Sequence, residues 1–178
     1  MNTVYVGNIK FLFSPRVSAD KYDDWQHVNR FWMKRNTKKI DVIVASIEPG
    51  ETWLLEVKDF RIVTDPPNAS NLSDLPGTVI QKAIHTLEGL EETSVNGMVQ
   101  SEKNLSFLFL RPGQNITLVL HLEPSAIPDS PLFFSKSYYL SVFQKLTQLK
   151  TRCPRITSFI IVHLTNPNHD LPWTATSI

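Results

Sequence analysis

The stretch that most constrains the fold is a strand-like run over residues 53–61, because charged residues interrupt an otherwise apolar sequence (WLLEVKDFR). Side chains two residues apart in an extended chain share a face, so Glu56 and Lys58 point the same way. The start of the run is apolar without alternation, which indicates a strand covered on both faces. A charge on such a strand is costly unless it is paired or binds a metal ion. The fold must therefore bring compensating charge to this strand.

A second β-branched run, residues 38–47, precedes this strand and carries Asp41. Pro49 and Gly50 lie between the two runs and are typical of the centre of a type II turn. This turn predicts a hairpin in which Asp41 lies opposite Lys58 and is the diagonal neighbour of Glu56. A four-residue loop keeps Asp41 on that face, whereas a three-residue loop moves it to the opposite face. We therefore expect Asp41, Glu56 and Lys58 to converge.

Length and composition predict a single globular domain over residues 1–178, with 42% hydrophobic and 20% charged residues. The formal net charge of +1 excludes a basic field over the whole molecule, so a nucleic-acid site must be local. One cysteine, Cys153, excludes an internal disulfide, and no secretory pattern opens the chain, so we expect a cytoplasmic protein. No apolar run approaches the roughly 20 residues that span a bilayer, which argues against a membrane protein.

The remaining patterns predict a mixed β-sheet with helices packed on it. Expected strands cover residues 4–13, as one strand or a hairpin turning at Gly7 and Asn8, then 105–110 and 116–122 as a second hairpin, and 157–164. Expected helices cover residues 22–35, 78–92 and 135–150, the last joining two parallel strands. Residues 64–77 should form a loop, and Trp173 should pin a turn-rich tail over residues 166–178.

The converging side chains favour hydrolysis of a phosphodiester. Two adjacent carboxylates repel each other, so one pKa rises unless a cation lies between them. Asp41 and Glu56 offer the oxygen ligands that Mg²⁺ prefers, with water and phosphate oxygens completing its shell. Lys58 can orient the attacking water and oppose the charge that develops on the phosphate. The simpler alternative is a cross-strand salt bridge in which Lys58 only neutralises Asp41, since Glu-x-Lys is a common tripeptide.

Asp41 followed by Glu56-Val57-Lys58 on the next strand resembles the PD-(D/E)xK nuclease superfamily. The resemblance implies an α/β, restriction-endonuclease-like fold with a mixed central β-sheet flanked by helices. It implies a metal-dependent endonuclease in which Asp41, Glu56 and the backbone carbonyl of Val57 hold Mg²⁺ or Mn²⁺. Lys58 is the catalytic lysine in this interpretation.

The same resemblance implies that the helix after the Glu-x-Lys strand sends a polar side chain to the site. Gln81 is the preferred candidate for this catalytic role, and Lys82 is the other. Two departures stand out: Ile40 replaces the proline of the motif, and no strand appears between Arg35 and Asp41, where the family core has one. Residues 4–13 are the candidate to supply that strand.

The implied partner is nucleic acid, with DNA favoured over RNA, and the resemblance allows a homodimer or a partner protein that supplies specificity. The rival interpretation is a noncatalytic nuclease-like interaction module, or a subunit of a larger nucleic-acid-processing complex, using aromatic residues such as Trp25 and Tyr138. The five histidines show no metal-protease spacing, and we expect them to be surface or internally satisfied residues. Nucleotide-binding glycine loops and a nucleophile elbow are absent from the sequence, which leaves acyl transfer and nucleotide-driven reactions without support.

Overall fold

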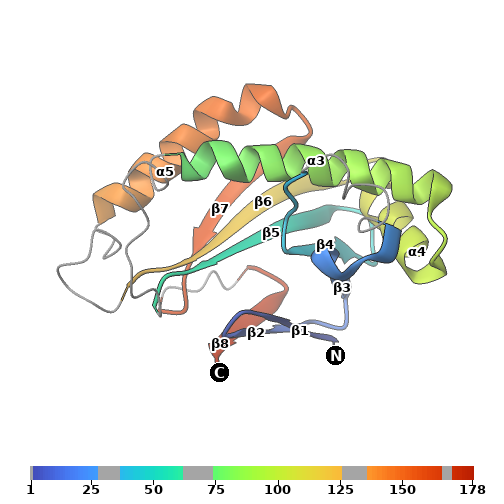
Figure 1. Cartoon of the computed structure of the whole chain (residues 1–178), viewed down its shortest axis with the longest axis horizontal. Coiled ribbons are helices and arrows are strands. Elements are labelled where there is room, and N and C mark those ends of the chain that lie inside the picture. The colour runs from blue at the N-terminus through green and yellow to red at the C-terminus, as the bar shows by residue number, and fades with distance from the viewer. Residues whose placement is uncertain (1, 28–36, 62–73, 126–135, 166–169) are drawn as a thin grey trace.

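The protein has three layers in the computed structural model, which describes residues 2–27, 37–61, 74–125, 136–165 and 170–178 (Figure 1). Three helices lie on one face of a five-stranded sheet, and a three-stranded sheet lies against the other face. The prediction of a mixed sheet carrying helices is confirmed in this form. Among the described residues, however, a second sheet rather than helices covers the far face.

The five-stranded sheet consists of β3 (Val17–Lys21), β4 (Val42–Ser46), β5 (Glu51–Asp59), β6 (Asn115–Glu123) and β7 (Ile156–Val162), in that order. Strands β3, β4 and β5 pair antiparallel, whereas β5, β6 and β7 pair parallel. Strand β5 is therefore the centre of the sheet, where the antiparallel and parallel halves meet.

Both faces of β5 are buried, which explains its lack of apolar alternation. Leu54 packs in the core between the sheet and the helices. Trp53, Leu55 and Val57 pack in a second core between the two sheets. Glu56 and Lys58 share the parity of Leu54, so they face the helices.

The three-stranded sheet consists of β1 (Asn2–Val6), β2 (Ile9–Phe13) and β8 (Trp173–Ser177). Of the two alternatives for residues 4–13, one strand or a hairpin, the structure has the hairpin: Val6 pairs with Ile9, and Gly7 at φ +56° supplies the left-handed conformation that a two-residue turn requires. Trp173 does pin the tail, since its ring packs against Phe13 at 5.5 Å and Trp53 at 6.0 Å between centroids. The strand that Trp173 begins was not predicted.

Helices α3 (Leu75–Asn96) and α5 (Lys136–Leu149) confirm the helices expected at 78–92 and 135–150, and α5 joins the parallel strands β6 and β7. Two short 3₁₀ turns, η1 (Tyr22–Asp24) and η3 (Lys150–Arg152), also lie within the described residues, so the chain begins the region of the expected 22–35 helix as a 3₁₀ turn. The helix expected at 22–35 lies mostly outside the described residues, and so does most of the 64–77 loop. Within the described ranges, no helix is long and apolar enough to cross a membrane.

The prediction of a strand at residues 105–110 is wrong, and with it the second hairpin. These residues belong to helix α4 (Gln100–Leu110), and β6 pairs with β5 instead. Leu105 and Phe109, four residues apart, are buried together in the helix-side core, while Phe107 between them is 56% exposed. The buried positions recur at helical spacing. The sequence does not show this spacing, because the exposed positions of this short run are apolar as well.

The predicted register of the β4–β5 hairpin is wrong by two residues. Val42 lies opposite Leu55, and continuing this register places Asp41 opposite Glu56 rather than Lys58. Four residues, 47–50, join the two strands. Gly50 hydrogen-bonds to the start of β6 and not to β4: its N–H donates to the Gln114 side chain and its carbonyl accepts from Asn115 N–H. An even shift preserves the face of every side chain, so the predicted convergence survives.

The strand beside the acid-bearing strand is β3, not residues 4–13, which form the other sheet. Strand β3 lies at the edge and pairs Val17 with Ser46 and Lys21 with Val42. It was not predicted because its five residues include three polar ones. It also precedes η1, so it comes earlier in the chain than the family pattern requires.

Candidate functional site

The Asp41 carboxylate is held against the central strand by the backbone of β5. Its Oδ2 accepts a hydrogen bond of 2.7 Å from Val57 N–H. The Asp41 carbonyl accepts another, of 2.9 Å, from Tyr22 N–H, which ties the start of β4 to η1. The side chain is therefore fixed where β4 begins, beside Glu56.

Glu56 is fully buried and lies between two lysines. Its Oε1 is 2.7 Å from Lys58 Nζ and 2.7 Å from Lys82 Nζ, and its Oε2 is 2.9 Å from Lys82 Nζ. Lys82 Nζ also lies 3.9 Å from Asp41 Oδ1. A single ammonium group from α3 thus joins both carboxylates, while Lys58 shares the Glu56 Oε1 atom with it.

Burial and the neighbouring negative charge of Asp41 raise the pKa of Glu56, and the two lysines oppose that rise. Burial lowers the pKa of Lys58, but the attraction and hydrogen bond of Glu56 outweigh it, so the net shift is upward. Asp23 on η1 belongs to the same electrostatic environment, because burial and then the charge of Asp41 raise its pKa. The site therefore combines crowded acids with the cations that compensate them.

The structure brings together Asp41, Glu56 and Lys58, as the sequence predicts, and adds Lys82. Gln81, the preferred candidate on this helix, is exposed, and its Nε2 lies 2.6 Å from His85 Nε2. Adjacent positions on a helix point about 100° apart, so only one of the two can face the sheet. The open choice between Gln81 and Lys82 depends on the rotation of α3, which its packing on the sheet decides.

The oxygen atoms of this site fit a hard divalent cation, because a cationic group, the Lys82 ammonium, already lies between the two carboxylates. The Lys82 ammonium acts as a stand-in cation, in contact with Glu56 and 3.9 Å from Asp41. Oxygen ligands of this kind suit Mg²⁺. A set of three or more His, Cys, Asp or Glu side chains arranged for a metal is not found in the described part of the chain. Backbone, water and substrate oxygens would have to supply the remaining ligands.

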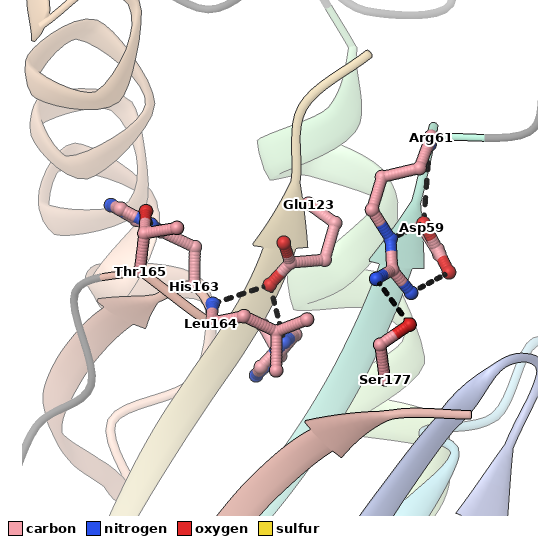
Figure 2. Close-up of polar contacts among 8 residues, drawn as sticks. Asp59, Arg61, Glu123, His163, Leu164, Thr165 and Ser177 are labelled. Atoms are coloured by element: carbon pink, nitrogen blue, oxygen red, sulfur yellow. Dashed lines mark hydrogen bonds and ion pairs between the residues drawn. The ribbon is translucent and has the colours of Figure 1, made fainter. Parts of the chain in front are cut away.

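A second polar cluster lies on the opposite face of the sheet, at the carboxyl ends of the parallel strands (Figure 2). Asp59 binds the Arg61 guanidinium through both oxygens, at 2.8 and 2.7 Å, and Arg61 reaches Ser177 of β8 at 2.8 Å. Glu123 Oε1 accepts a bond of 2.6 Å from Leu164 N–H and lies 2.7 Å from His121 Nε2. The cluster ties β8 and the segment that follows β7 to the central strands.

Sequence reasoning missed this cluster because it depends on the parallel register that sets Asp59 beside Glu123. His121 is buried, and its Nε2 lies 2.7 Å from Glu123 Oε1, whereas its Nδ1 finds no hydrogen-bond partner among the described residues, so the expectation of surface or internally satisfied histidines holds for it only in part. Burial opposes the ionisation of Glu123, but the bonds from His121 and Leu164 outweigh it and hold the pKa of Glu123 below its usual value. We therefore assign the cluster a structural role, in which it holds the two sheets together.

The fold and site together define a mixed α/β protein with a buried acid–lysine cluster at the central strand. A cysteine–tRNA ligase from Neisseria meningitidis serogroup A, serotype 4A, is 28% identical to the chain over 213 residues. That similarity covers 99% of this chain but only 30% of the ligase, so the chain spans less than a third of that relative. No protein-family model matches the chain, and no solved structure matches it.

Proposed function

We propose that this chain is a divalent-metal-dependent nuclease of the PD-(D/E)xK type, which hydrolyses phosphodiester bonds of nucleic acid. One observation carries the proposal: the carboxylates of Asp41 and Glu56 converge on a single cationic group, with Lys58 beside them. A restriction-endonuclease-like fold is the matching proposal for the five-stranded sheet with its helices. The proposed fold differs from the family pattern at two points: Ile40 replaces the proline of the motif, and β3 comes earlier in the chain.

Asp41 and Glu56 would hold Mg²⁺ or Mn²⁺ in this proposal. The Val57 carbonyl is the further ligand that we propose, because the N–H and C=O of one strand residue point to the same side, and the Val57 N–H points to Asp41. The ion, when bound, supplies a Lewis acid that makes water a stronger nucleophile at neutral pH.

Lys58 is the catalytic lysine of this proposal, and its contacts and partial exposure support that role. Its ammonium is 2.7 Å from Glu56 Oε1 and its side chain is 29% exposed, so it connects the buried acid with solvent. From there it can orient a water molecule for in-line attack. It can also oppose the negative charge that builds on the phosphate as the new P–O bond forms and the backbone P–O bond breaks.

DNA is the substrate that we favour over RNA, with a homodimer or a partner protein supplying specificity and the cytoplasm as the expected compartment. A second candidate is a noncatalytic nuclease-like module of a larger nucleic-acid-processing protein. Two observations favour it: Glu56 is fully buried with both lysines already paired to it, and the similar bacterial protein, named as a cysteine–tRNA ligase, is more than three times as long as the matching region. In that case RNA is the expected partner.

Cleavage assays separate the two candidates. Labelled duplex DNA, single-stranded DNA and transfer RNA are incubated with the wild type, Asp41→Ala or Lys58→Ala, in Mg²⁺, Mn²⁺ or chelator. Lys103→Ala is the matched control, because Lys103 lies on α4, away from the acid–lysine cluster, and its exposed ammonium donates to the Val95 carbonyl. The nuclease proposal expects metal-dependent cleavage that both site variants lose by at least about 100-fold and the control retains. Nucleic-acid binding without cleavage in all four proteins would instead favour the module.

A further inference from the structure

Lys82 lies where a divalent cation would have to bind. Its ammonium contacts both oxygens of Glu56, at 2.7 and 2.9 Å, and lies 3.9 Å from Asp41. We propose that Lys82 is an internal competitor for the metal, and that its ammonium must leave the two carboxylates before the ion binds. This inference rests on the proposed metal-dependent function, which it makes conditional on a movement of one side chain.

Distances exclude joint occupancy. Mg²⁺ binds oxygen at roughly 2.0–2.1 Å, so an ion on the Glu56 oxygens would lie in contact with an ammonium bonded to the same two atoms. The two cations repel each other at that range, and water screens the repulsion only weakly beside Glu56, which is fully buried. One of the two must give way.

The charge balance leads to the same conclusion. Two carboxylates, Asp41 and Glu56, now face two ammonium groups, Lys58 and Lys82, and the four charges cancel. Adding a divalent ion without moving a lysine leaves two uncompensated positive charges around a carboxylate that has no exposure to solvent. Withdrawal of Lys82 reduces the excess to one, which the single negative charge of a phosphodiester neutralises. Metal and substrate should therefore bind cooperatively.

Lys82 has both the freedom and a destination to make this movement. It reaches the carboxylates from the sheet-facing side of α3 but keeps 17% of its side chain exposed, and a lysine ammonium is a point charge on a flexible four-carbon stem. The Asp23 carboxylate of η1 lies next to this cluster, because the neighbouring Tyr22 N–H donates to the Asp41 carbonyl at 2.9 Å, and the charges of Asp23 and Lys82 interact. Asp23 is the group that we expect to receive the displaced ammonium.

The test measures Mn²⁺ binding by titration calorimetry in the wild type, Lys82→Met and the control Lys103→Met. Methionine keeps the unbranched stem and removes the charge. We expect Lys82→Met to bind Mn²⁺ at least about tenfold more tightly than the wild type, and Lys103→Met to match the wild type.

A second measurement uses the wild type alone, so it holds even if Lys82→Met does not fold. Acetic anhydride labelling, read by peptide mass spectrometry, reports how accessible each lysine is. We expect Mn²⁺ to increase the labelling rate of Lys82 relative to Lys103, because the ammonium is released towards solvent.

The outcomes separate the two proposals. Equal or weaker Mn²⁺ binding in folded Lys82→Met, or unchanged labelling of Lys82 in a wild type that binds Mn²⁺, overturns the competition and leaves the nuclease proposal standing. Binding by Lys82→Met but not by the wild type supports the competition and counts against metal-dependent activity of the natural chain. Absence of Mn²⁺ binding in every folded protein overturns both.

Discussion

Glu56→Gln should destabilise this protein more than any other single charge removal at the site. Glu56 is fully buried and makes three contacts of 2.7–2.9 Å with the ammonium groups of Lys58 and Lys82. Removing one partner from a buried ion pair costs about 3–5 kcal/mol, because it leaves an uncompensated buried charge. The stranded lysines are 29% and 17% exposed and can partly turn to water. We therefore expect the lower end, about 3 kcal/mol.

Guanidinium unfolding at pH 7 in chelator, followed by tryptophan fluorescence, measures this difference in the free energy of unfolding. In a domain of this size, about 3 kcal/mol corresponds to a fall in Tm of roughly 6–12 °C. Glu51→Gln is the matched control, since Glu51 is exposed at the start of the same strand, and we expect it to change stability by less than about 0.5 kcal/mol.

The double variant Glu56→Gln with Lys82→Met checks the physical reason. It removes one charge of each sign, so it should recover part of the stability that Glu56→Gln loses. A loss below about 1 kcal/mol for Glu56→Gln, or no recovery in the double variant, would refute the view that a buried, compensated charge cluster governs stability here.

Three further predictions concern the scaffold. Glu123→Gln should lower the free energy of unfolding at neutral pH and make it depend less on acid. The folded state lowers the pKa of Glu123, so the stabilisation by this carboxylate is present above about pH 4.5 and is lost as the pH falls through the lowered pKa. Measuring the free energy of unfolding as a function of pH in both proteins tests this. Trp173→Ala should cost about 3–5 kcal/mol in urea unfolding by emptying the core between the sheets, whereas Ile178→Ala, 66% exposed, should have little effect; equal losses would contradict the packing. Gly7→Ala should cost about 1–2 kcal/mol through its backbone alone, since φ is +56° and no atom lies within 4 Å of the added methyl group, and an unchanged Tm would contradict this.

The sequence could predict the shared face of Asp41, Glu56 and Lys58 because strand parity is a local property. An error of two residues in the hairpin register left that face unchanged, whereas an error of one would have reversed it. Helices α3 and α5 could be predicted from the sequence as well, since each buries one stripe of apolar residues at helical spacing.

Helix α4 and strand β3 could not be identified in the same way. The run at residues 105–110 has apolar side chains on its buried and exposed sides alike, so its period is hidden, and packing on α3 and the sheet decides for a helix. Strand β3 is short and largely polar, and it is a strand because β4 offers it a free edge.

The sequence by itself therefore determined a two-sided central strand, the hairpin before it and three charged side chains on one face, all through chain geometry over a few residues. Only the tertiary structure decided that β5 pairs in parallel with β6, that Lys82 rather than Gln81 reaches Glu56, and that Asp59 lies beside Glu123. Those choices depend on how distant segments pack and on the rotation of a helix against a sheet. Local periodicity carries no information about either, because each alternative leaves the same apolar stripe buried.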